Sequence, residues 1–199
     1  MRYSRAAHTI ASVLGPEFRE VMRAAARGDE AAFARLWRDN QPQLLRYLRV
    51  VTGEPAEDVA SEVWLEVCRR LGRFRGGESE FRGWLFTTAR RRVIDLRRYA
   101  ARHPMLLTDD PRELDQRAPD DTADAALERM SSDAALDLIA RLPREQAEII
   151  ILRAIAGLNA TQVARIVGKR PGTVRVAAHR GLRTLASMLF AASDEGVTR

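Results

Sequence analysis

Lysine, cysteine and long apolar runs are almost absent from this chain of 199 residues. Its one cysteine, Cys68, excludes an intrachain disulfide and a cysteine-cluster zinc site, and its place in a helical pattern predicts a small core residue. No apolar run reaches the roughly 18 residues that span a bilayer. No apolar core precedes Pro16, which argues against a signal peptide. We therefore expect a cytoplasmic protein with no membrane insertion of its own.

The patterns of catalytic sites are missing as well. The sequence has no GxxxxGK[ST] phosphate-binding loop, and its three histidines, His8, His103 and His179, are too scattered to suggest a site. The acidic stretch at 104–133 has no histidine or cysteine ligand and no rigid scaffold, which argues against a carboxylate metal site. We predict that the chain is not an enzyme and that it uses neither a cofactor nor a metal.

Arginine carries nearly all of the positive charge, because Lys169 is the only lysine. The chain has 33 Lys and Arg against 27 Asp and Glu, which gives a formal net charge of +6. This excess favours a polyanionic partner, and arginine suits bidentate contacts with phosphate and guanine. A GC-rich genome also produces arginine, so composition alone leaves both explanations open.

Apolar residues recur at helical spacing along most of the chain, and no stretch has the alternation of a strand. The sequence therefore predicts an all-α fold with two small helical domains joined by an acidic flexible linker. The expected parts are an N-terminal lead-in at 1–16, a first domain at 17–103, a linker at 104–131, a second domain at 132–190 and a tail at 191–199.

Four helices are expected in the first domain. Pro16 and Gly28 bound the first, and Asp29 as N-cap and Gly53 bound the second. The third covers 54–74, and the fourth extends from 81 to about 102. One stripe of the third helix is apolar and consists of Val59, Val63, Val67 and Leu71. We expect this stripe to face the core.

The loop at 73–80 joins an aromatic side chain to a cation, and the helix after it is strongly basic. In RFRGGESE, Phe74 and Arg75 adjoin two glycines, a combination that can stack an unpaired base; a plain interhelix loop with Phe74 in the core is the alternative. Against Asp95 alone, the helix carries seven arginines: Arg82, Arg90, Arg91, Arg92, Arg97, Arg98 and Arg102. These charges repel one another unless phosphates or acidic partners lie nearby. They favour a nucleic-acid contact.

The sign of the charge then reverses. Segment 104–133 has nine acidic residues against three arginines, with three prolines and few large apolar side chains. Such a composition predicts a solvated linker. Beyond it, the apolar run 149–152 predicts a helix at the centre of a small bundle.

The stretch 160–185 is typical of a helix-turn-helix. Ala164 lies on the first helix, Gly168 ends it, and Val174 follows six residues later on the second. A small residue, a turn glycine and an apolar residue at this spacing let two helices cross closely. The second helix would carry Arg175, His179 and Arg180 outward, as a helix in a DNA major groove does. This segment predicts DNA binding.

In order along the chain, three segments resemble a sigma factor of RNA polymerase, of the compact group 4 or extracytoplasmic-function (ECF) kind. AEDVASEVWLEVCRRLGRFRG at 56–76 resembles the family's segment that docks on the polymerase clamp, and FRGWLFTTARRRVIDLRR at 81–98 resembles its promoter −10 segment. The stretch 142–182, which contains the helix-turn-helix, resembles its −35-reading domain. The resemblance covers the chain from about 29 to 189.

The resemblance implies a factor of transcription initiation that joins core RNA polymerase, directs it to promoters and helps to melt them. The implied polymerase contacts are Asp58, Glu62, Trp64, Leu65, Arg69 and Leu71. The implied −10 contacts are Phe74, Arg75, Gly76, Arg90, Arg91, Asp95 and Arg98. The implied −35 contacts are Lys169, Arg170, Thr173, Arg175, Val176, His179 and Arg180.

This sequence departs from the family's pattern at three places that bear on binding, one of them Ala177 and Ala178, which replace larger residues on the recognition helix and could contact a thymine methyl. Ser61 stands where the family commonly has glutamine in the clamp-binding helix. Arg170 stands where a serine or threonine usually caps the recognition helix, and Pro171 follows it. We therefore expect the uncapped N–H groups at this entrance to bind a DNA phosphate.

The resemblance also implies partners. These are the clamp and flap regions of the large polymerase subunits, promoter DNA and an anti-sigma factor. A stand-alone helix-turn-helix transcriptional regulator is the alternative function. Such a regulator usually needs a dimer interface or a ligand pocket, and the first domain shows neither pattern.

Overall fold

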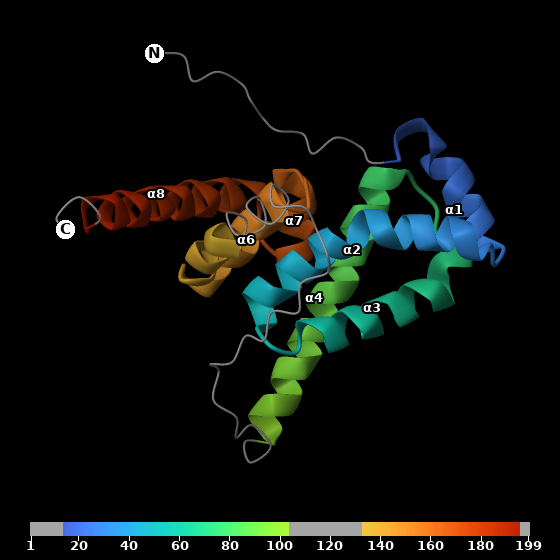
Figure 1. Ribbon diagram of the computed structural model, residues 1–199, viewed down its shortest axis with the longest axis horizontal. Helices are drawn as coiled ribbons and strands as arrows, with labels where there is room; N and C mark the ends of the chain where they lie inside the picture. Colours follow the sequence, from blue (N-terminus) through green and yellow to red (C-terminus); the bar gives the residue numbers. More distant parts are fainter. Residues whose placement is uncertain (1–13, 104–132, 196–199) are drawn as a thin grey trace.

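The computed structural model describes residues 14–103 and 133–195, and all regular elements in these ranges are helices (Figure 1). The predicted all-α fold is confirmed for this part of the chain. The expected lead-in up to residue 13, the linker at 104–131 and the end of the tail lie outside the described residues.

Residues 14–103 form six helical elements. They are η1 (Gly15–Glu17), α1 (Phe18–Ala26), α2 (Glu30–Thr52), α3 (Ala56–Arg70), η2 (Leu71–Arg73) and α4 (Glu78–Arg102). The bounds expected for α2 are confirmed: Asp29 accepts a hydrogen bond from the N–H of Ala32 at 2.8 Å, and Gly53 ends the helix with φ +71°. α4 begins three residues earlier than predicted, because Glu80 accepts the N–H of Gly77 at 2.9 Å and closes the first turn.

The apolar stripe of α3 is buried, as predicted. Val63 and Val67 are 0% exposed, and they belong to one core with residues of α2 and α4. Cys68 is exposed, so its prediction as a core residue is wrong. It follows Val67 by one position, and one residue turns a helix by about 100°, which carries Cys68 out of the stripe.

After residue 132 the chain is helical at 133–140 and then forms α6 (Arg144–Ala154), α7 (Ala160–Val167) and α8 (Pro171–Glu195). The run 149–152 is fully buried, which confirms α6 as a central helix. Ala164 and Val174 are 3% and 0% exposed, and Gly168 takes the left-handed conformation with φ +70°. Asn159 begins α7 by accepting the N–H groups of Thr161 and Gln162, each at 3.0 Å. The helix-turn-helix is confirmed.

The two halves pack against each other, α6 on α2 and α7 beside α4 (Figure 1). Glu148 of α6 joins them: its Oε1 accepts the hydroxyl of Tyr47 at 3.1 Å and the Nε–H of Arg90 at 2.8 Å. Gln162 of α7 donates to the hydroxyl of Ser79 at 2.7 Å. Tyr47 is 0% exposed, so its hydroxyl depends on Glu148 for a partner.

Because of this contact, the free energy of unfolding should fall at alkaline pH. Burial, and then the neighbouring Glu148 carboxylate, raise the pKa of Tyr47 well above 10.0. The folded chain therefore keeps the phenol proton, whereas the unfolded chain loses it near pH 10, so the contribution is full below that pH and declines above it.

Tyr47→Phe removes this titration. The wild type's free energy of unfolding should fall more steeply above about pH 10 than the variant's, by up to about 1.4 kcal/mol per pH unit. Urea unfolding followed by circular dichroism at several pH values measures both slopes. Equal slopes would show that Tyr47 ionises alike in the folded and unfolded chains.

Candidate functional site

The outer side of α3 is the first surface that the sequence singled out. Asp58, Glu62, Leu65 and Arg69 are exposed, Leu65 by 55%. The other two predicted contacts require a correction, since Trp64 is 6% and Leu71 4% exposed. The indole N–H of Trp64 donates to Gln41 Oε1 at 2.7 Å, and the Phe33 ring stands edge-on to the indole at 5.8 Å. Both side chains support the surface from within.

A groove of about 410 Å³ runs beside this surface, between α2 and α3. Its lining is mostly apolar and consists of Phe33, Trp37, Gln41, Ser61, Trp64, Leu65 and Cys68. Trp37 is 40% exposed and was missed as a surface residue. Its spacing assigns Trp37 to the apolar stripe of α2. Spacing alone does not show whether a residue lies at the exposed edge of a stripe or at its buried centre. Ser61 turns its hydroxyl to the carbonyl of Glu57 at 3.0 Å.

The arginines of α4 divide into two groups. Several have partners within the protein: Arg82 pairs with Glu78 at 2.5 Å, Arg90 with Glu148, and Arg92 with Glu62 and Glu66 at 3.8 and 3.9 Å. Arg97 donates to the carbonyl of Val51. The acidic partners that the sequence left open therefore exist for part of the helix. A predicted −10 residue, Arg90, is among the paired ones.

The second group on α4 consists of Arg91 and Arg98, with Asp95 between them. All three are exposed, and their spacing of four and three residues places them on one side of the helix. Within the described residues, none of the three is in an ion pair. Two guanidinium groups are thus available to phosphates on this side, and Asp95 lies between them.

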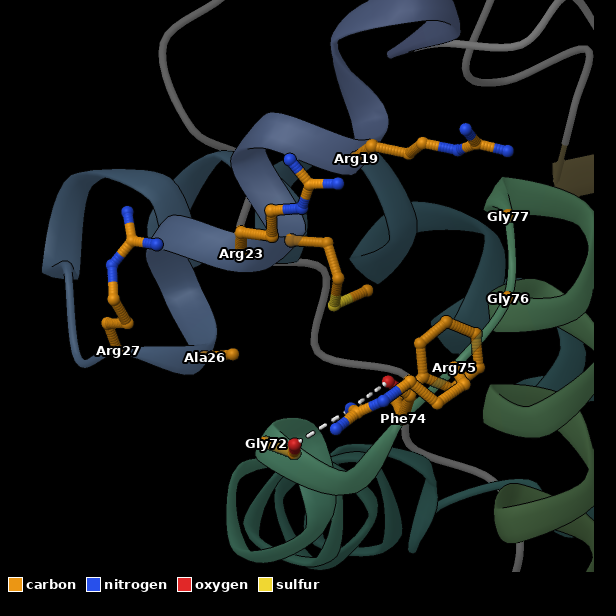
Figure 2. A pocket seen from close by; sticks show the side chains of 10 residues that line it. Arg19, Arg23, Ala26, Arg27, Gly72, Phe74, Arg75, Gly76 and Gly77 are labelled. Carbon is orange, nitrogen blue, oxygen red and sulfur yellow. Dashed lines mark hydrogen bonds between the residues drawn. The ribbon is translucent and has the colours of Figure 1, made fainter.

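Phe74, Arg75 and Gly76 lie on the loop before α4. The half-buried ring of Phe74 stacks on Trp84, with centroids 5.4 Å apart, and meets Phe81 edge-on at 5.7 Å. Arg75 is exposed and donates to the carbonyls of Gly72 and Phe74. The loop also lines a cavity of about 650 Å³ (Figure 2). Phe74 packs on the core and borders this cavity at the same time.

The seven residues assigned to the −35 element are all exposed, Val176 by 51%. Val174 and Ala178 of the same helix are buried, so packing on the rest of the domain turns the other sides of α8 to solvent. Lys169 approaches Glu145 at 3.3 Å. At the start of α8 the carbonyl of Arg170 accepts the N–H of Val174, and no side chain in the described residues accepts the N–H of Gly172 or Thr173.

The described residues contain neither a metal-binding cluster nor a membrane-spanning helix. No group of three His, Cys, Asp or Glu side chains in the described residues could hold a metal ion. No helix among them is long and apolar enough to cross a membrane.

Known families match both halves of the chain. Residues 36–103 match Sigma-70 region 2, and residues 132–185 match Sigma-70, region 4. The first match contains α3, the loop and α4, and the second contains the helix-turn-helix. The class is therefore that of RNA polymerase sigma factors.

Curated relatives narrow the class. The ECF RNA polymerase sigma factor ShbA of Streptomyces griseus is 35% identical over 173 residues, which cover 82% of this chain and 91% of ShbA. SigD of Mycobacterium tuberculosis is 33% identical over 197 residues, covering 90% of this chain and 87% of SigD. BldN of Streptomyces coelicolor is 33% identical over 174 residues, and this chain spans 65% of its length. This chain belongs to the family of ECF RNA polymerase sigma factors, whose members act in transcription initiation.

Two solved structures share the fold. CnrH in complex with the cytosolic domain of CnrY has a TM-score of 0.59 at 21% identity and covers 87% of this chain and 97% of that one. The sigma factor RpoE in complex with the anti-sigma factor NepR, from Bartonella quintana, has a TM-score of 0.62 at 20% identity, with coverages of 84% and 98%. At such identities the likeness concerns the fold.

The two groups of α4 arginines predict different effects on stability. Arg82→Ala should lower the free energy of unfolding by about 3 kcal/mol, because it breaks an ion pair whose side chains are only 9% and 13% exposed. Arg91→Ala should change it by less than about 0.5 kcal/mol, because Arg91 is exposed and outside any ion pair of the described residues. Urea unfolding of both variants measures the difference. Equal losses would refute the division of α4 into structural and available arginines.

Proposed function

We propose that this chain binds core RNA polymerase through the outer side of α3, reads the −10 element with α4 and the loop before it, and reads the −35 element with α8. The observation that carries the proposal is the set of three exposed surfaces, in the family's order, on a fold shared with solved sigma factors. The clamp and flap regions of the large polymerase subunits are the expected docking partners.

The α3 surface has the composition of a protein interface. Two large apolar side chains, Trp37 and Leu65, are exposed at the groove, and Asp58, Glu62 and Arg69 lie on the same helix as Leu65. Apolar anchors surrounded by charged side chains are what interfaces use for affinity and orientation. Buried Trp64 and Leu71 would set the shape of this surface.

At the −10 element, Arg91 and Arg98 would bind phosphates while the loop accepts a base from the opened strand. Phe74 and Gly76 line the cavity that would receive the base, beside Arg75. Capture of a base shifts the duplex toward the open state only by the preference of the site for the unpaired strand. The chain would thereby assist melting and supply no catalytic step.

At the −35 element, Arg175, Val176, His179 and Arg180 would face base edges, and Thr173 would lie near the backbone. A bidentate arginine–guanine contact supplies about 1–3 kcal/mol of discrimination against the wrong base. The uncapped entrance of α8, next to Lys169 and Arg170, would hold a phosphate and add affinity without sequence preference.

Simultaneous contact with both elements requires the two halves to separate. The elements lie roughly 25 base pairs apart, which at about 3.4 Å per pair is about 85 Å of duplex. The halves of the free chain are in direct contact through Glu148. The 104–132 segment, at up to about 3.5 Å per residue, can reach about 100 Å, so one chain can bridge the elements once Arg90 exchanges Glu148 for a phosphate.

The family and the sequence support two further points of the proposal. The chain would act in the cytoplasm, where promoter DNA is. It would also be held inactive by an anti-sigma factor, since a solved sigma factor of this fold is bound to one.

Promoter-selective initiation tests the proposal. Purified core polymerase is incubated with the chain on a library of randomised promoters, and the transcribed sequences are read. We expect initiation that depends on the chain and selects two sequence elements. Arg175→Ala should relax selection at one position of the −35 element, whereas replacing both Lys169 and Arg170 with alanine should weaken initiation evenly across sequences.

DNA binding without any effect on initiation would refute the proposal and support a stand-alone helix-turn-helix regulator. Loss of discrimination at a single position in the Lys169 and Arg170 double variant would contradict the phosphate assignment alone.

A further inference from the structure

Helix α1 carries a row of arginines that the functions above do not use. Arg19, Arg23 and Arg27 recur at every fourth position, which places them on one side of the helix and its end, and all three are exposed. None of them is in an ion pair within the described residues. α1 ends at residue 26, before the matched sigma region 2 begins at residue 36. The family match therefore assigns this helix no role.

The three arginines lie on α1, opposite the loop at 72–77, and both segments line the cavity of about 650 Å³ (Figure 2). Arg75 borders the same cavity from the loop, so four arginines line it, and no carboxylate side chain is in its lining. Like charges at this density favour an anion between them. The two walls are held together because α1 packs against η2.

The remaining wall is apolar and fixed in shape. The side chains of Met22, which is 7% exposed, and half-buried Phe74 also line the cavity. Gly76 has φ +150°, and a Cβ there would lie 2.8 Å from Cβ of Glu80 and 3.0 Å from Cζ of Phe74. No side chain fits at Gly76. The absence of one lets the loop backbone pass close to the Phe74 ring and adds no atoms to the cavity.

We propose that the arginine row of α1, Arg19, Arg23 and Arg27, binds the sugar–phosphate backbone of the unpaired DNA strand whose base enters the cavity. The inference rests on the proposed function and extends its −10 site to a helix outside the matched region. An apolar wall for a base, with cations around it for successive phosphates, is the composition that single-stranded nucleic acid requires. Residues at i and i+4 lie about 6 Å apart along a helix, close to the spacing of phosphates in a strand.

The test measures binding of a fluorescent oligothymidylate of about a dozen nucleotides, by anisotropy, to the full chain alone and to the chain joined to core polymerase. Arg23→Ala should weaken binding several-fold and reduce the slope of log affinity against log salt by about 0.7. The triple replacement of Arg19, Arg23 and Arg27 with alanine should reduce the slope by about 2. Circular dichroism confirms that each variant is folded.

Arg38→Ala is the matched control, because it removes one exposed arginine from α2 that does not line the cavity. Equal slopes for Arg23→Ala and Arg38→Ala would overturn the proposal, as would absence of oligonucleotide binding in both the free and the polymerase-bound chain. Free nucleotide is the other source of phosphate. If ATP displaces the probe at concentrations where an equal charge of sulfate does not, the cavity is a nucleotide site and the strand assignment is wrong.

Two outcomes distinguish the proposed function from the binding of DNA by α1. Wild-type chain that directs promoter-selective initiation, together with unaltered oligonucleotide binding by Arg23→Ala, would reject the α1 site and keep the sigma-factor mechanism. Wild-type chain that binds the oligonucleotide through Arg23 but directs no initiation would reject the mechanism.

Discussion

The carboxylate of Glu148 joins the two halves of the described chain, together with the packing of α6 on α2 and the Gln162–Ser79 hydrogen bond. It accepts the hydroxyl of Tyr47, which is buried in the core of the first half, and the Nε–H of Arg90 on the helix assigned to promoter DNA. Removing the carboxylate would leave a buried hydroxyl without a partner and a half-buried arginine without its counter-charge, and both losses are costly. The relative placement of the two surfaces proposed to read DNA therefore depends in part on this contact.

The same contact relates structure to function, because a phosphate can replace the carboxylate at Arg90. Phosphate and carboxylate are both anions that accept hydrogen bonds from a guanidinium, so Arg90 keeps a charge-assisted hydrogen bond when one replaces the other. The −35 surface of α8 and the α3 surface are exposed while the halves are together. The contact thus partly covers Arg90 and leaves the surfaces proposed for polymerase and −35 DNA accessible.

Local features of the sequence predicted the helices well, because caps and turns act over a few residues. Asp29 and Gly168 mark helix ends in both the sequence and the structure, and the valine stripe of α3 is buried as expected. Pairings across the fold were not predictable, since Arg90 and Glu148 are 58 positions apart and nothing in either segment identifies the other. Cys68 and Trp64 show the limit of spacing: each directly follows a valine of the α3 stripe, yet Cys68 is exposed and Trp64 is buried, because packing with neighbouring helices decides exposure.

A distance measured by fluorescence energy transfer tests whether the halves separate on promoter DNA. In a Cys68→Ser background, dyes are attached to Glu54→Cys in the exposed α2–α3 turn and to Ser187→Cys on the exposed side of α8. The account predicts high transfer in the free chain and low transfer once core polymerase and promoter DNA are added. Unchanged transfer in a complex that initiates transcription would contradict it.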